Sequence, residues 1–459
     1  MSAPILSIDP PFVSDRSVAS LRAALVGQLL QPGDAGYAQA RRLWNGAVDI
    51  RPAMIARCRT AQDVVHAVNF ARTEGLPVAV RAGGHNAAGL ALCEGGLVID
   101  LSQMKRVTVD PVRRVAKAEP GLTIREFVAI LEPYGLLTTT GTCGGTGIAG
   151  STLGGGIGWL TGKYGMAVDN VLAFEVVTAQ GELLRASADE NADLFWALRG
   201  GGGNFGVVTA IEYRLHPIGQ IFGGTVLHMR ANAAELLRFY RDFSSAAPDE
   251  LIVYAVMMNL PDVGPAMAMT GCFCGEDLAE GERVLAPLRK MGTPIADLYR
   301  PMKYSELIAL LDPTAPDGRN YADTAYSLAN PGDDALDALL VCAERATSPF
   351  TSIVVHHVNG AATRVAPDAT AYALRTPHYA IVNGAGWESG PAEAHIAWTH
   401  ASLARMKPFI NLGLYVNFMG EGSEVEIQQA YQGNYERLVA LKKRYDPDNF
   451  FRRNQNIRV

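Results

Sequence analysis

The sequence predicts an α+β fold with more than one domain, and three observations carry that prediction. The chain has 459 residues, which at roughly 150 residues per domain suggests about two to three domains. Hydrophobic residues make up 48% and charged residues 19%, as in ordinary globular proteins. Many of the 47 glycines gather in short segments before residue 217, and glycine thins out beyond about residue 219.

The part before Pro217 predicts short helices and strands in alternation. A helix begins at Ser14-Asp15, and a second follows Thr60 and is closed by Gly75 and Pro77. A strand at 78–80 runs directly into residues 81–86. The remaining expected elements are strands at 96–101 and 113–119, a helix from a capping box at Thr123, a hairpin of 171–178 with 182–186, a helix at 189–199 and a strand at 211–216.

The sequence pattern after Pro217 differs from the pattern before it. Helices of 10–15 residues alternate with apolar strands, which predicts a separate α+β domain. The expected helices cover about 232–245, 278–290, 334–346 and 391–406, and the expected strands cover about 251–259, 351–358 and 378–386. The last segment predicts a strand at 413–418 and a long polar helix at 424–443.

Composition argues against several partners. The 40 Lys+Arg against 46 Asp+Glu give a net charge of -6, so no nucleic-acid surface built on bulk basicity is expected. No apolar run reaches the ~18 residues of a membrane span, and residues 1–11 carry no readable secretory signal. No apolar stretch follows Arg41-Arg42, so a twin-arginine export signal is not expected. Six cysteines are too sparse for a disulfide framework. We therefore expect a cytoplasmic protein with no membrane partner.

Two stretches match G-x-G-x-x-G, at 145–150 and 201–206. Neither follows a strand and opens a helix as the dinucleotide-binding fingerprint requires. A nicotinamide site and merely flexible loops remain alternatives. The favoured interpretation is a backbone that approaches a large ligand at several places, with amide N–H groups cradling a pyrophosphate.

Residues 81–86 carry the most informative pattern, a histidine beside two glycines directly after a strand. The segment resembles the R-x-G-G-H-N signature of FAD-linked oxidases of the vanillyl-alcohol oxidase superfamily, in the berberine-bridge-enzyme-like branch. In that family the histidine is bonded covalently to the flavin 8-methyl group. The resemblance therefore implies that His85 holds FAD.

A second segment, 141–150, matches the family's G-x-C-x-x-x-G-x-x-G pattern. There the cysteine bonds to the flavin benzenoid ring, so the resemblance implies a second bond from Cys143. A singly attached flavin is the alternative, as is the ordinary role of a cysteine as a small buried apolar residue. The other cofactor-binding residues implied by the family's motifs are Arg81, Ala82, Gly83, Gly84, Asn86, Thr142, Gly147, Gly150, Ser151, Gly154, Gly155, Tyr164, Gly165, Asp169, Asn170, Asn204, Gly206, Val208 and Asn454.

Two segments near the C-terminus, 415–418 and 444–456, resemble the family's last motif pair, which returns to the flavin domain. The resemblance thus implies an FAD-binding domain split between 1–218 and 413–459, with an α+β substrate domain at 219–412. Residues 44–46 and 55–58 resemble bacterial members, including 6-hydroxynicotine oxidases.

The sequence departs from the family where a catalytic base is expected. Many members have Y-x-N-Y, in which the second tyrosine takes the proton, but Phe418 stands there. Berberine-bridge enzymes proper have a glutamate where this chain has Arg364. Tyr415 and Asn417 are the catalytic candidates that remain, although Tyr415 also fits an aromatic packing role. An amine substrate stays open because a neutral amine needs no strong base.

The resemblance implies an oxidase that passes hydride from a small alcohol, sugar or cyclic amine to FAD and is reoxidised by O₂ to give H₂O₂. Thr146, three residues after the tethering cysteine, stands where a bulky aliphatic residue is associated with blocked oxygen access. Its size predicts an open route for O₂. A dehydrogenase with another acceptor, or a flavin carrier without turnover, are the alternatives. The sequence predicts no oligomeric state.

Two of three further patterns have ordinary structural explanations. His356 and His357 are neighbours on a strand, so they point to opposite faces. Cys272 and Cys274 lack a second pair to complete a zinc site and are expected to be structural. The segment 375–378 is a weaker candidate for lining the substrate cavity.

Overall fold

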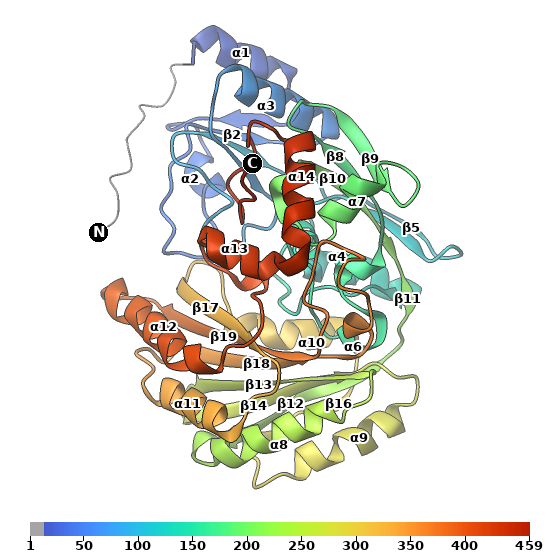
Figure 1. The fold of residues 1–459 in the computed structure, drawn as a ribbon, viewed down its shortest axis with the longest axis vertical. Helices are drawn as coiled ribbons and strands as arrows, with labels where there is room; N and C mark the ends of the chain where they lie inside the picture. The colour runs from blue at the N-terminus through green and yellow to red at the C-terminus, as the bar shows by residue number, and fades with distance from the viewer. Residues whose placement is uncertain (1–12) are drawn as a thin grey trace.

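The computed structural model describes residues 13–459, so residues 1–11, which carried the expectation about an export signal, lie outside the described part. Figure 1 shows two halves stacked along the long axis. We call residues 13–218 with 413–459 the glycine-rich half and residues 219–412 the eight-stranded half. In residues 13–459 no helix is both long enough and apolar enough to cross a membrane.

The glycine-rich half begins with a four-stranded sheet in the order β1-β2-β4-β3. Helices α1 and α3 pack their apolar faces onto it. They begin after Ser14 and Thr60, as expected, and the structure adds that Thr60 forms a capping box with Asp63. The elements are α1 Asp15–Ala24, β1 Gln28–Leu30, α2 Tyr37–Ala40, β2 Met54–Arg57, α3 Ala61–Thr73, β3 Val78–Arg81 and β4 Leu97–Asp100. Strand β3 ends where the His85 loop begins.

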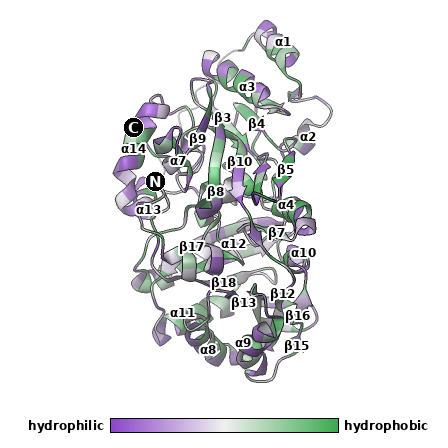
Figure 2. Ribbon diagram, turned by 90° about the vertical axis from the view of Figure 1, so that its right-hand side faces the viewer, coloured by the Kyte–Doolittle hydropathy of each residue, from purple (hydrophilic) through white to green (hydrophobic). Residues whose placement is uncertain are grey.

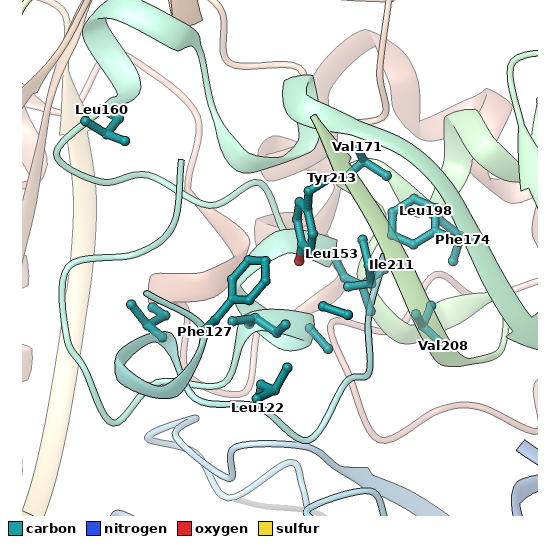
Figure 3. Packing of buried hydrophobic residues seen from close by; sticks show 14 of the residues in the cluster. Leu122, Phe127, Leu153, Leu160, Val171, Phe174, Leu198, Val208, Ile211 and Tyr213 are labelled. Atoms are coloured by element: carbon teal, nitrogen blue, oxygen red, sulfur yellow. The ribbon is translucent and has the colours of Figure 1, made fainter. Parts of the chain in front are cut away.

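A five-stranded antiparallel sheet completes the glycine-rich half, in the order β5-β6-β10-β8-β9. Its apolar face packs on helices α4 and α5, as the cluster around Phe127, Leu153 and Tyr213 in Figure 3 shows. The elements are β5 Val107–Asp110, β6 Val115–Ala118, α4 Ile124–Leu131, β7 Leu136–Leu137, α5 Ile148–Leu153, α6 Thr161–Tyr164, β8 Val171–Val177, β9 Leu183–Ser187, α7 Ala192–Leu198, β10 Val207–Arg214 and β11 His216–Pro217.

The second half is built on an eight-stranded sheet that runs β15-β12-β14-β13-β18-β19-β17, with β16 beside β12. Helices α8, α9, α11 and α12 bury one face of this sheet, and Figures 1 and 2 show α8, α9 and α11 on the side away from the glycine-rich half. The elements are β12 Ile221–Met229, α8 Ala233–Ser245, β13 Leu251–Leu260, β14 Gly264–Phe273, α9 Leu278–Lys290, β15 Ala296–Asp297, β16 Arg300–Met302, α10 Tyr304–Leu311, β17 Asn320–Leu328, α11 Asp333–Glu344, β18 Ser352–Val358, β19 His378–Trp387 and α12 Ala392–Met406.

The opposite face of this sheet meets the glycine-rich half. Ile252, Tyr254 and Cys272 join the same apolar cluster as Phe127 and Trp159 of the glycine-rich half. The chain then returns to the glycine-rich half through helices α13 Glu424–Tyr431 and α14 Tyr435–Tyr445, and α14 packs beside α7. The sheet face between the halves is therefore where side chains of both can meet.

Two expectations near the C-terminus are wrong. The predicted strand at 413–418 is instead an irregular segment ending in a 3₁₀ turn, Val416–Phe418. The predicted helix at 424–443 is two helices, because Gln432 takes a left-handed φ of 49° and the Asn434 side chain donates to the carbonyls of Pro367 and Thr370. These tertiary hydrogen bonds override the helical pattern.

Strands β5, β12, β14 and β17 have no counterpart among the predicted elements. Strand β14 is rich in alanine and glycine, which have low strand propensity. It forms because β12 and β13 pair with it on both sides along nearly its whole length. Pairing, which the local sequence does not encode, decides its conformation.

Candidate active site

His85 lies on the loop that leaves β3, and aromatic rings stack against it. Gly84 has a φ of 68°, a left-handed conformation that favours glycine. The Trp44 ring stacks on the His85 imidazole with 4.2 Å between ring centroids, and Tyr321 also stacks on Trp44, at 3.9 Å. Because Tyr321 belongs to β17, the His85–Trp44–Tyr321 stack joins the two halves.

The His85 imidazole is neutral at physiological pH. Burial lowers the pKa of His85 to about 4, and the nearby Asp317 opposes that shift only in part. The side chain lies deep in the molecule yet keeps part of its surface accessible. A neutral imidazole that keeps part of its surface accessible has a nitrogen lone pair available to form a bond.

The Cys143 loop lies directly against the His85 loop. The amide of Thr146 donates to the Cys143 carbonyl at 3.1 Å and closes a tight turn. A Cβ added to Gly83 would lie 2.4 Å from the Gly147 nitrogen, so these two backbones touch. A Cβ on Gly145 would lie 3.9 Å from His85 Nε2. The structure therefore brings together the loops of the two predicted attachment residues.

The Cys143 thiol is protonated in this environment. Burial is the main cause that raises the pKa of Cys143, Asp312 adds to it, and a hydrogen bond with Thr142 opposes it. Asp312, from the eight-stranded half, accepts a hydrogen bond from the Gly144 amide at 3.0 Å and pairs with Arg125 at 2.6 Å. Asp312 thus anchors the Cys143 loop to the opposite half. Like His85, Cys143 lies deep but stays partly accessible.

Tyr415 and Asn417 form one hydrogen-bonded unit with the glycine segment after α5. The Tyr415 hydroxyl accepts from the Gly156 amide and from Asn417 Nδ2, both at 2.8 Å, and Asn417 Nδ2 also donates to the Ser151 carbonyl. Burial raises the pKa of Tyr415 to about 12. A protonated phenol whose oxygen already accepts two hydrogen bonds is poorly suited to take a further proton.

The sheet face above these loops carries an aromatic chain. Trp159 stacks on Tyr254 at 4.4 Å, Tyr254 packs on His356 at 4.6 Å, and His356 on Phe418 at 5.6 Å. Burial lowers the pKa of His356 to about 3. Among the described residues, Trp159 Nε1 and His356 Nε2 are buried without a hydrogen-bond partner, so both present unsatisfied polar atoms at this junction.

Asp323 is the residue here that sequence reasoning missed. It lies on β17 two residues after Tyr321, so its side chain is on the face that carries the His85–Trp44–Tyr321 stack. Burial raises the pKa of Asp323 to about 7. The alternation of Tyr321, Asp323 and Ala325 could have indicated a strand. Nothing in the sequence indicates which face would meet His85.

Several predicted cofactor residues shape the loops through contacts within the protein. Arg81 donates to the Ala40 carbonyl, and the Asn86 side chain accepts from the amides of Ala88 and Leu90. A Cβ on Gly154 would lie 2.0 Å from Asn417 Oδ1, and one on Gly155 would lie 2.7 Å from Met166 Cε. These residues determine where the backbone runs, and Ala82 keeps part of its surface accessible beside them.

The segment 164–170 is also held by contacts within the protein. The Tyr164 ring stacks on His216 at 4.0 Å, and Asn170 donates to the carbonyls of Tyr164 and Met166. Asp169 pairs with the buried Arg375 at 2.7 Å and packs against Gly165. The Arg375 guanidinium is therefore occupied by Asp169, which argues against a role in lining the substrate cavity.

The predicted residues after 200 tie the C-terminal segment to the second glycine cluster. Asn204 donates to the carbonyls of Gly201 and Gln455 and accepts from the Ile457 amide, while Asn454 donates to Gly203. Gly206 has a φ of 154°, and Val208 is buried in the core.

A buried lysine reinforces this connection. Lys442, fully buried, donates to the Asn204 carbonyl at 2.9 Å and pairs with Asp446 at 2.6 Å. Sequence reasoning did not single out this pair. Its i, i+4 spacing on a polar helix looks like an ordinary exposed ion pair.

The other sequence patterns behave as expected. His356 faces Tyr254, whereas His357 stacks on Tyr379 on the opposite face of the sheet. Cys272 and Cys274 are both buried, and Cys272 packs in the apolar cluster that joins the halves.

The residues present fit a flavin nucleotide. A Cβ at Gly150 or at Gly203 would meet nothing within 4 Å, so the backbone there is open to a ligand. The side-chain oxygens of Asn454 and Asn456 are buried without a partner among the described residues. Open glycine backbone, unpaired polar atoms and the two partly accessible side chains of His85 and Cys143 suit a large polar cofactor.

Comparisons with known proteins agree with this geometry. Residues 52–187 match the family described as "FAD binding domain", and residues 414–458 match "Berberine and berberine like". An uncharacterised FAD-linked oxidoreductase of Bacillus subtilis is 31% identical over 94% of this chain and 98% of its own. The (R)-6-hydroxynicotine oxidase of Paenarthrobacter nicotinovorans is 30% identical over 95% and 97%.

The crystal structure of 6-hydroxy-D-nicotine oxidase from Arthrobacter nicotinovorans superposes with a TM-score of 0.85. It is 29% identical and covers 95% of this chain and 98% of that one. The likeness therefore extends across both halves.

Proposed function

The chain belongs to the FAD-linked oxidoreductases of the vanillyl-alcohol oxidase superfamily, in the berberine-bridge-enzyme-like branch, and on that premise we propose that it is an oxidase that holds FAD covalently through His85 and Cys143. One observation carries the proposal. The His85 and Cys143 loops, 58 positions apart by residue number, touch backbone to backbone at Gly83 and Gly147.

Each covalent bond joins one side chain to one flavin carbon. In forming such a bond the His85 nitrogen or the Cys143 sulfur would lose its hydrogen, and O₂ would take up that hydrogen and one from the flavin carbon as H₂O₂. Both side chains begin in the required form, a neutral imidazole and a thiol that border accessible space. Two bonds hold the cofactor without enclosing it, which leaves room for a substrate.

The proposed division of labour follows the two halves. Residues 1–218 and 413–459 form the cofactor domain, in which Gly147, Gly150, Ser151, Asn204 and Asn454 border the nucleotide, and residues 219–412 form the substrate domain. FAD supplies a hydride acceptor that O₂ can reoxidise. The protein's part is to orient the substrate's C–H bond, exclude water and receive the substrate's proton.

The proposed substrate is a small alcohol, sugar or cyclic amine. The relative named (R)-6-hydroxynicotine oxidase makes (R)-6-hydroxynicotine the first compound to test. The partly accessible residues Ala325, Val354 and Val382 on the sheet face offer small apolar side chains against which a ring can pack.

The test has two parts. Purified protein is precipitated with acid, and the pellet is expected to stay yellow, also in His85→Ala and in Cys143→Ala, because the other bond remains. The double variant should release its flavin. A colourless pellet from the unmutated protein contradicts covalent attachment.

The intact protein is then mixed with (R)-6-hydroxynicotine, xylobiose or benzyl alcohol, and H₂O₂ is measured. At least one compound should give H₂O₂ in step with its own loss. Loss of the compound with reduction of a quinone dye but no H₂O₂ would identify a dehydrogenase instead.

A further inference from the structure

Asp323 lies in a row of small residues on the sheet face between the two halves. On the neighbouring strand β19 it pairs with Gly384, and Gly384 pairs in turn with Ser352 of β18. A Cβ on Gly384 would lie 3.2 Å from Asp323 Oδ1, so the carboxylate rests directly over a residue without a side chain. The next row is Ala325, Val382 and Val354, all of which stay partly accessible.

The Asp323 carboxylate has no hydrogen-bond or ion-pair partner in residues 13–459, although several other acids of this half are paired. Asp312 is paired with Arg125, and Glu388 with Arg319. Asp323 lies deep in the molecule but keeps part of its surface accessible, as His85 and Cys143 do. A carboxylate buried without a partner lowers stability, so a functional use is the natural reason for its position.

We propose that Asp323 is the residue that accepts the substrate's proton, the substrate being a small molecule with an O–H or N–H group beside the carbon that loses hydride. This inference rests on the proposed function, because the hydride must leave to FAD. In the step, the O–H or N–H bond breaks and its proton passes to an Asp323 oxygen. The C–H bond breaks with its electron pair, and those atoms are left joined by a C=O or C=N double bond.

The two residues that could compete for this role are less suitable. Tyr415 is protonated and its oxygen is already occupied by Gly156 and Asn417. Burial lowers the pKa of His356 to about 3, which makes its imidazole a weak proton acceptor. The standard positions of the family hold Phe418 and Arg364 here, and Arg364 pairs with Asp249.

The charge state of Asp323 changes near neutrality. Burial raises its pKa to about 7, so the carboxyl is protonated below that pH and is an acceptor above it. The titratable groups presented to the same side are Tyr321 on its own strand, His356 on β18, His85 beyond Trp44, and Tyr415 beside the 3₁₀ turn. None of these four groups is charged at neutral pH. The acid Asp317 and the base Arg319 precede β17 near His85 and Tyr321, and Arg319 pairs with Glu388.

The first test detects the charge of the Asp323 carboxyl through its effect on the visible spectrum of the flavin. The visible spectrum of the flavin-loaded protein is titrated from about pH 5 to about pH 9. The unmutated protein and the control Asp334→Asn, which loses an exposed acid on α11, should show a spectral change with a midpoint of about 7. Asp323→Asn should show none. The same midpoint in Asp323→Asn, or no change in the unmutated protein, overturns the proposal.

The second test measures anaerobic flavin reduction by whichever of the three probe compounds reduces the protein. Asp323→Asn should slow reduction by about 10²–10⁴-fold and abolish the rise of the rate through pH 7, whereas Asp323→Glu should recover part of the rate. Tyr415→Phe should lose less than about tenfold. A reduction rate for Asp323→Asn within threefold of the unmutated protein contradicts the inference.

The acid pellet separates the two proposals. A yellow pellet from Asp323→Asn shows that slow reduction is not loss of cofactor. A colourless pellet from the unmutated protein refutes covalent flavin attachment. In that case the pH dependence of unfolding still tests Asp323. The folded state would bind more protons than the unfolded state between about pH 4 and pH 7, so stability should fall as pH rises through this range, and less so in Asp323→Asn.

Discussion

The glycine-rich half and the eight-stranded half form the two sides of the candidate site in different ways, the first with glycine-containing loops and the second with one face of a sheet. The first contributes close-packed backbone, where Gly83 and Gly147 touch and Gly150 is left open, and its loops carry His85 and Cys143. The second contributes side chains on one sheet face, Asp323, His356 and Tyr254. A site that requires close backbone approach leaves a run of glycines in the sequence. A site built on a pleated face needs only every second residue and leaves no motif.

The two halves also differ in whether their acidic side chains have ion-pair partners. Asp169 and Asp446 of the glycine-rich half pair with the buried side chains of Arg375 and Lys442, so their charges are compensated. Asp323 of the other half has no such partner among the described residues. Paired acids stabilise the frame that holds the cofactor loops, and an unpaired acid is available for chemistry.

The largest effect is expected where the two loops touch. The first added carbon of Gly83→Val would lie 2.4 Å from the Gly147 nitrogen, which costs about 3 kcal/mol of overpacking and separates the loops. Covalent flavin should then fall roughly 100-fold, measured as flavin absorbance per protein after acid precipitation. Gly219→Ala, where a Cβ meets nothing within 4 Å, is the control and should keep its flavin. Full flavin content in Gly83→Val would show that loop contact is not required.

The second prediction concerns the sheet face. Burial lowers the pKa of His356 to about 3, so at pH 5 the unfolded chain binds a proton there and the folded chain does not. Stability should therefore fall as pH drops below about 6.5, by about 1.4 kcal/mol per pH unit from this group, or about 2 kcal/mol by pH 5. His356→Phe should remove that part of the slope in urea unfolding. The exposed His400→Gln should leave the slope unchanged, and an unchanged slope in His356→Phe contradicts the prediction.

The smallest expected effect concerns Thr146, whose size is proposed to control the access of O₂ to the flavin. Thr146 is partly accessible beside the Cys143 turn. Thr146→Leu should slow reoxidation of the reduced flavin by O₂ at least about tenfold, about 1.4 kcal/mol of barrier, and leave anaerobic reduction largely intact. Stopped-flow mixing of reduced protein with oxygenated buffer measures this. Slow reoxidation of the unmutated protein with fast reduction of a quinone dye would favour a dehydrogenase.

The sequence alone determined the elements whose signals are local. Helix α3 begins after Thr60 and helix α4 begins at the capping box of Thr123, both as expected, because a cap and its amide partner lie within four residues. The hairpin β8–β9 forms where its turn predicts it. The sequence was also enough to propose His85 and Cys143 as attachment residues, because the two motifs that carry the family resemblance are short and contain them.

Only the tertiary structure decided the rest. Strand β14 exists because two neighbours pair with it, and the C-terminal helix breaks at Gln432 because Asn434 is bound to the Pro367–Thr370 segment. Asp323 lies on the sheet face that reaches His85 through Tyr321 and Trp44, although positions 85 and 323 are far apart in the chain. Such contacts depend on which sheet face meets which loop. Which face meets which loop depends on packing across the whole molecule, so it cannot be predicted from any short stretch of sequence.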